Sequence, residues 1–121
     1  MSEDNKKQTG AVHLTANNFE ATLSNEKGLL VFVDFFAMWC GSCNMAAPVV
    51  DKLADEYRDK IIIAKLDVDE SKQTAQQYGV MSLPTAIIFK NGEEVDRTIG
   101  FPGEDGFRQM IERNLKDEAE E

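Results

Sequence analysis

Two cysteines, Cys40 and Cys43, are the residues of this chain whose type and spacing could carry redox chemistry. They are the only cysteines among 121 residues, and Gly41 and Ser42 lie between them. A secreted protein held together by disulfides would spread several cysteines along its chain. One local pair instead indicates thiol–disulfide exchange or half of a metal site.

The elements expected on either side of the pair favour the redox interpretation. Residues 29–36 are apolar on both alternating faces, which predicts a central buried strand. Apolar residues then recur every four positions, at Met45, Val49, Leu53 and Tyr57, with Pro48 among them. This pattern predicts an amphipathic helix of about four turns, kinked at the proline. The start of a helix stabilises a thiolate, so Cys40 could attack a disulfide and Cys43 could resolve the product.

Two other interpretations of the cysteine pair stay open on this evidence. A structural zinc site takes four ligands, and the chain adds only His13 to the two cysteines as a nitrogen or sulfur ligand. Alternatively, both cysteines are bystanders buried in the core. The small residues Gly41 and Ser42 argue against that alternative, because they keep the loop tight and open.

Asp34 is a second candidate for chemistry because it lies within a run of valines and phenylalanines. We expect it to face the interior under the cysteine loop, on the same side as Phe32 and Phe36. Burial disfavours the charged form, so its pKa should rise and it could exchange a proton with a nearby thiol. The alternative is a structural aspartate satisfied by Lys65 or by water. Lys65 either modulates Asp34 or extends to solvent.

Trp39 directly precedes Cys40. A tryptophan at that position can shield the sulfur and offer a flat contact surface to a partner. The alternative for Trp39 is ordinary packing in the core.

The remaining pattern predicts an α/β fold with a mixed sheet. We expect a short helix capped by Thr15, with Phe19 and Leu23 buried, then a strand over 61–68 and a weaker helix over 71–78. Two strands follow over 85–89 and 94–99, joined by the turn residues Asn91-Gly92. A last helix carries apolar residues on one face, at Phe107, Met110, Ile111 and Leu115. Strand–helix units followed by a hairpin predict four to five strands with helices on both faces.

Composition suits a single domain, since 42% of the residues are hydrophobic. We expect a flexible tail over 1–10, one domain over 11–117 and an acidic tail over 118–121, with fraying from Lys116 onward. The formal charge of −9 disfavours binding to nucleic acid or anionic membranes. No stretch resembles a membrane span or a secretory signal. We therefore expect a cytoplasmic monomer.

Several segments, in order along the chain, resemble the thioredoxin family. Residues 33–43, VDFFAMWCGSC, followed by Pro48, are similar to its active-site segment. Residues 64–69 are similar to its next strand, and residues 78–85 to its cis-proline loop. Lys90-Asn91-Gly92 and Gly100 fit its hairpin and the glycine after it. The resemblance covers about residues 12–115, nearly the whole chain.

The resemblance implies a thioredoxin fold and a protein-disulfide reductase. Cys40 would be the nucleophile, Cys43 the resolving thiol and Asp34 the buried acid/base, with Lys65 beside it. Pro84 would be cis, leaving the backbone around Leu83 free to pair with an extended substrate. The implied substrate-binding residues are Trp39, Gly41, Ser42, Val68, Leu83, Pro84, Gly100 and Phe101.

The resemblance also implies no metal and no bound cofactor. Electrons would come from NADPH through a flavin-containing thioredoxin reductase and pass to the disulfides of target proteins. A thiol oxidase or isomerase is one alternative. The other is a binding module or subunit with incidental redox activity, for which the apolar surface would serve equally well.

Three residues depart from the family pattern. Ser42 stands where the family usually has proline, and it adds an N–H group and a hydroxyl that can stabilise a thiolate. A more stable reduced form makes a better oxidant, so we expect a less reducing protein than a proline-bearing relative. Asn44 replaces a common lysine, and the lost positive charge partly opposes the serine effect. Phe36 replaces a frequent tryptophan, which we expect to change packing only.

Overall fold

A five-stranded mixed sheet lies at the centre of the structure, a computed structural model that describes residues 10–120. The elements are β2 (Val12–Leu14), α1 (Phe19–Leu23), β3 (Val31–Phe36), α2 (Gly41–Glu56), β4 (Ile62–Asp67), α3 (Lys72–Gln77), β5 (Thr85–Lys90), β6 (Glu93–Ile99) and α4 (Glu104–Ala119). The strand order is β2-β4-β3-β5-β6. β4 pairs in parallel with β2 and β3, whereas β5 pairs antiparallel with β3 and β6. The expected mixed sheet is confirmed.

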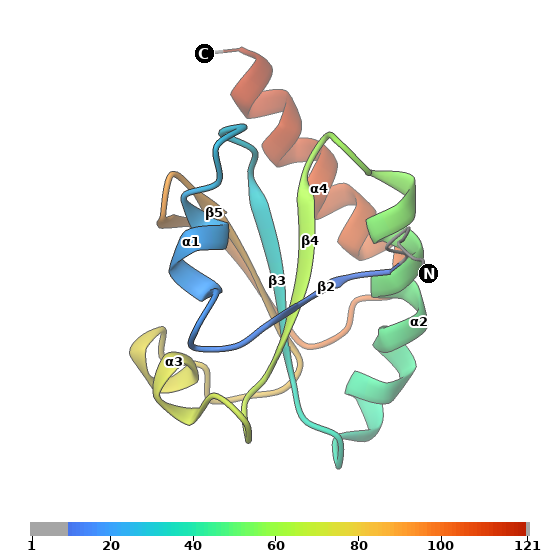
Figure 1. The fold of residues 1–121 in the computed structure, drawn as a ribbon. Helices are drawn as coiled ribbons and strands as arrows, with labels where there is room; N and C mark the ends of the chain where they lie inside the picture. The colour runs from blue at the N-terminus through green and yellow to red at the C-terminus, as the bar shows by residue number, and fades with distance from the viewer. Residues whose placement is uncertain (1–9, 121) are drawn as a thin grey trace, which may run out of the picture.

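Helices cover both faces of the sheet, as Figure 1 shows, with α1 and α3 on one face and α2 and α4 on the other. Alternate residues of β3 supply the two cores. Phe32 packs with residues of α2 and α4, whereas Val33 and Phe35 pack with residues of α1 and α3. The strand is therefore buried on both faces, which is the reason for its unbroken apolar run.

The hairpin turn between β5 and β6 follows the sequence prediction. Asn91 and Gly92 both have positive φ, at 51° and 85°. A two-residue turn of this kind needs left-handed backbone at both positions, which asparagine and glycine tolerate best.

The structure corrects three expectations about helix ends and faces. Asn18, and not Thr15, is the N-cap of α1, because Thr15 belongs to the turn before it. Met45 is 67% exposed, since the buried face of α2 runs through Ala46 and Val50 instead. α4 continues past Lys116, where we expected fraying, to Ala119.

One strand was missed, and part of the expected tail cannot be compared. β2 is three residues long, too short to show an alternating pattern, and it forms only by pairing with β4. Residues 1–9 of the expected tail lie outside the described residues. None of the helices within residues 10–120 is long and apolar enough to cross a membrane.

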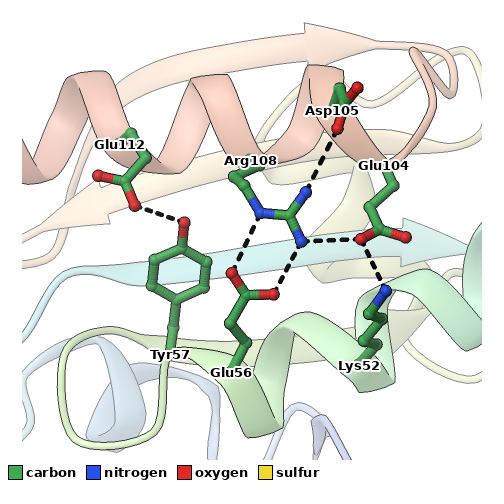
Figure 2. Close-up of polar contacts among 7 residues, drawn as sticks. All are labelled: Lys52, Glu56, Tyr57, Glu104, Asp105, Arg108 and Glu112. Carbon is green, nitrogen blue, oxygen red and sulfur yellow. Dashed lines mark hydrogen bonds and ion pairs between the residues drawn. The ribbon is translucent and has the colours of Figure 1, made fainter.

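Arg108 joins α4 to α2 through a network of charged groups (Figure 2). Its guanidinium donates to Glu56 of α2 at 2.8 and 3.1 Å and to Glu104 of α4 at 2.7 Å. Lys52 Nζ lies 2.9 Å from Glu104, and Tyr57 donates to Glu112 nearby. Hydrogen bonds from Arg108 hold the pKa of Glu56 and of Glu104 below its usual range. The network therefore fixes the helix that begins at the cysteines against its neighbour.

We expect Arg108→Gln to lower the melting temperature at low salt, because Glu56 and Glu104 then face each other without their shared cation. The groups are exposed, so about 1 M salt, with a Debye length of ~3 Å, should shrink the difference. Thermal unfolding of both proteins at low and high salt measures the effect. Identical melting temperatures at low salt would contradict it.

Candidate active site

The cysteine pair lies at the junction between the end of β3 and the start of α2. Cys40 is the N-cap of α2, with extended backbone at φ −91° and ψ 115°. Cys40 and Cys43 form a disulfide, and their Cα atoms are 5.2 Å apart. The N–H group of Cys43 donates to Cys40 Sγ at 3.2 Å. The positive end of the helix dipole and a backbone donor therefore both act on the Cys40 sulfur.

Accessibility separates the two sulfurs. Cys40 is 8% exposed and Cys43 is 2% exposed. Both pack with Ala37, and the half-buried side chains of Phe36, Val68 and Leu83 surround them. Cys40 is therefore the more accessible of the two, while Cys43 faces the protein interior.

Two polar side chains hold the loop around the disulfide. Ser42 Oγ lies 3.5 Å from Cys40 Sγ. Asn44 Nδ2 donates to the carbonyl oxygen of Met38 at 3.2 Å, which ties the first turn of α2 back to the end of the strand. The structure thus places the Ser42 hydroxyl beside the Cys40 sulfur, and its effect on a thiolate stays a prediction. The brace from Asn44 was missed, because it depends on how the chain turns between Met38 and Cys40.

Asp34 lies beneath the disulfide and is 3% exposed. It lines a pocket of about 240 Å³ that reaches Cys43 and Lys65. The other lining residues are Phe36, Met38, Asn44, Ala47 and Val50. The expected position of Asp34 under the cysteine loop is confirmed.

The electrostatics of Asp34 follow from its burial. Burial raises the pKa of the Asp34 carboxyl from 3.8 to about 7, and the positive charge of Lys65 opposes this only in part. Asp34 and Lys65 are neighbours on the paired strands β3 and β4. Even so, Oδ1 of Asp34 has no hydrogen-bond partner within the part of the chain that the structure describes. A carboxyl that titrates near neutral pH can give or take a proton inside this pocket.

Trp39 is 71% exposed, which excludes the alternative of core packing. Its Nε1–H group donates to Asp69 Oδ2 at 2.8 Å. This bond orients the indole next to Cys40 and leaves most of the side chain exposed to solvent. Asp69 follows the end of β4. It lies far from Trp39 along the chain, so the sequence does not predict this hydrogen bond.

The loop before β5 carries the expected cis-proline. The Leu83–Pro84 peptide is cis, as the resemblance implied. The N–H group of Gly100 donates to the Pro84 carbonyl at 2.7 Å, so Gly100 lies beside the cis-proline. Leu83 packs with the two cysteines. Most of the expected substrate-binding residues therefore gather around the disulfide.

Phe101, the residue after Gly100, also packs against helix α4. Its ring packs against Phe107 of α4, with ring centroids 5.4 Å apart, and it belongs to the edge of the core on that face. Its ring is only half-buried, so its expected part in target binding stays a prediction.

The sequence analysis missed three exposed methionines near the cysteine pair. Met38 is 71% exposed, Met45 is 67% exposed and Met81 is 94% exposed. Met38 and Met45 flank the cysteines in the sequence, and Met81 lies in the cis-proline loop. Exposed methionines adapt to many apolar partners. Each methionine lies within five residues of a motif residue in the sequence, but the apolar periodicity predicts burial for Met45, and no sequence pattern marks the other two as exposed.

Metal binding finds no support in the described residues. Within residues 10–120, no three side chains of the histidine, cysteine, aspartate or glutamate type form a group that could hold a metal ion. His13 Nε2 lies 2.9 Å from Glu70 Oε1. His13 therefore has a carboxylate partner away from the cysteines.

Comparisons with known proteins agree with this geometry. A family model described as Thioredoxin matches residues 10–113. The chain is 45% identical over 104 residues to the thioredoxin of Staphylococcus saprophyticus, which covers 86% of this chain and 97% of that relative. It is 44% identical to the thioredoxin of Staphylococcus epidermidis and 43% identical to that of Staphylococcus aureus, with the same coverage.

We expect Asp34→Asn to change how stability depends on pH. Between about pH 4 and pH 7, the folded protein keeps the Asp34 proton while the unfolded chain has lost it, so the stability of the parent falls as pH rises. Asparagine does not titrate in this range, so the variant lacks this pH dependence. Its free energy of unfolding relative to the parent should therefore grow by up to about 4 kcal/mol between pH 4 and pH 8. Urea unfolding across this range measures the difference, and parallel curves would contradict it.

Proposed function

The chain belongs to the thioredoxin family, and we propose that Cys40 and Cys43 divide its chemistry between nucleophile and resolving thiol. The protein is a thiol–disulfide oxidoreductase of the protein-disulfide reductase type, and its family needs no bound cofactor. The observation that carries the proposal is the disulfide at the start of α2, with the more exposed sulfur at the N-cap.

The first step is attack by the Cys40 thiolate on a target disulfide. A bond forms between Cys40 Sγ and one target sulfur, the target S–S bond breaks, and the other target sulfur leaves as a thiolate that takes up a proton. The α2 dipole and the Cys43 N–H group favour the thiolate form of Cys40. The product is a mixed disulfide between Cys40 and the target.

The second step is attack by Cys43 on Cys40 Sγ. It forms the intramolecular disulfide seen in the structure, breaks the bond between Cys40 and the target, and releases the second target sulfur as a thiolate that takes up a proton from solvent. The target gains two electrons and the cysteine pair loses them. Asp34 shares a pocket with Cys43, and we propose that it accepts the Cys43 proton as the thiol becomes a nucleophile. Lys65 tunes Asp34 through its charge.

Target binding takes place, in this proposal, at the surface around Cys40. The exposed face of Trp39 and the half-buried Val68 and Leu83 supply apolar contacts. The backbone next to Pro84 can pair with an extended target segment, as in strand addition. Gly41 and Gly100 leave room for close approach, since nothing lies within 4 Å of a Cβ atom built on either glycine, and Ser42 follows Gly41 in the same loop.

The oxidised pair must be reduced again for turnover. We propose that NADPH supplies the electrons through a flavin-containing thioredoxin reductase, and that the protein works as a monomer in the cytoplasm. A dithiol reductant stays in its reduced form only in a reducing compartment. The family normally works with such a reductase and with disulfide targets.

A turnover assay tests the cysteine roles. With NADPH and a thioredoxin reductase, the parent should reduce insulin disulfides, and Cys40→Ser should abolish the activity because the nucleophile is lost. Cys43→Ser should instead accumulate a mixed disulfide with the target, visible by mass spectrometry. A parent with two free thiols but no activity would favour a binding module, and accumulation with Cys40→Ser would reverse the roles.

A redox titration tests the role of Ser42. We expect Ser42→Pro to have a more negative reduction potential than the parent, because the hydroxyl 3.5 Å from Cys40 Sγ is lost and the reduced form is less stable. A shift on the order of 30 mV corresponds to about 1.4 kcal/mol. Ser42→Ala, which keeps the N–H group, should shift less. An unchanged or less negative potential in Ser42→Pro would disprove the role.

A further inference from the structure

Both ends of the cis-proline loop, residues 79–84, are attached to the edge strand β6. At the far end, the N–H group of Gly100, just after β6, donates to the Pro84 carbonyl at 2.7 Å. At the near end, Arg97 Nη2 donates to the Tyr78 carbonyl at 2.6 Å, and Nη1 lies 3.5 Å from the Gly79 carbonyl oxygen. One strand thus holds the loop at both of its ends.

The near end begins where α3 stops. The N–H groups of Gly79 and Val80 donate back to Gln76 and Ala75, and Gly79 has φ +64°. This is the glycine-terminated helix end that satisfies two of the last carbonyls. The Tyr78 carbonyl lies at the negative end of the helix, and the cationic side chain of Arg97 supplies its donor.

Arg97 itself is held in a fixed orientation. Its Nε and Nη2 atoms donate to the two carboxylate oxygens of Glu94 at 2.7 and 2.8 Å, and its side chain is 26% exposed. Its backbone lies opposite Ile87 in the β5–β6 ladder. A guanidinium fixed on one side by a carboxylate can anchor a carbonyl on its other side.

Between its ends the loop has one further hydrogen bond, which Thr85 Oγ1 donates to the Ser82 carbonyl at 2.6 Å. Met81 is 94% exposed, while Val80 and Leu83 are only half-buried against the core. The backbone that would pair with a target therefore depends on where its two ends are fixed.

We propose that Arg97 is a positioning residue for target binding. It holds the start of the cis-proline loop so that the backbone around Leu83 is presented in the extended form that a target segment can pair with. This inference rests on the proposed function, because it assumes that targets dock on this loop. Arg97 acts through the loop and not on the cysteines.

Kinetics with a large and a small disulfide test the proposal. For insulin, Arg97→Gln should raise KM about two- to tenfold, the effect of losing about one hydrogen bond, and should leave kcat unchanged. The rate at which the reduced protein reacts with Ellman's reagent should not change, because a small disulfide needs no docking loop. Arg97→Lys keeps the charge but lacks the fork, so its KM should lie between those of parent and Arg97→Gln.

Arg113→Gln is the matched control, since Arg113 of α4 pairs with Asp96 of β6 at 2.9 Å and does not reach the loop ends. An unchanged KM in Arg97→Gln, an equal rise in Arg113→Gln, or an equal loss of rate with Ellman's reagent would overturn the proposal. Amide exchange gives a second readout, because residues 80–83 should exchange faster in Arg97→Gln alone. Unchanged amide exchange of these residues in Arg97→Gln would overturn the inference about Arg97. A parent protein that cannot reduce insulin would overturn the proposed function instead.

Discussion

β3 has a parallel neighbour on one side, an antiparallel neighbour on the other, and helices packed on both faces, so its backbone cannot shift without opening both cores. The site depends on that constraint. The strand delivers Asp34 to the interior and ends at Phe36, only four residues before the N-cap cysteine. The position of the Asp34 carboxyl relative to the pocket and to Cys43 is therefore set by the central strand and not by the loop that carries the disulfide.

Burying a carboxyl in this way has a cost that the rest of the domain must offset. A group that titrates near neutral pH is useful for proton transfer, but its ionised form is poorly solvated at 3% exposure. Large apolar side chains on both faces of the sheet, such as Phe32 and Phe35, supply the opposing stabilisation. Stability and reactivity are thus coupled at one residue, as is common for active sites.

Much of this could be predicted from the sequence, and the failures share a physical origin. The buried strand, the amphipathic helix and the Asn91-Gly92 turn follow from local patterns, whereas the sequence left the exposure of Trp39 open. β2 could not be predicted, because three residues gain their structure from β4. Pairings such as Trp39 with Asp69, or Arg97 with Tyr78, join residues 19 to 30 positions apart, and no local rule reports them. The exposure of Met45 depends on which face of α2 packs on the sheet, and that face runs through Ala46 and Val50.

Gly10 and Ala11 are tied to the second half of α2, where their N–H groups donate to Asp55 and Asp51 at 3.1 and 2.9 Å. Those aspartates lie about two to four turns along the helix from the disulfide at its start. α4 also ends at the opposite edge of the molecule from the cysteine loop, as Figure 1 shows. A surface tether or a fused partner attached at either end of the described chain would thus leave the sulfurs facing outward, which suits the protein to immobilisation with its reactive edge free.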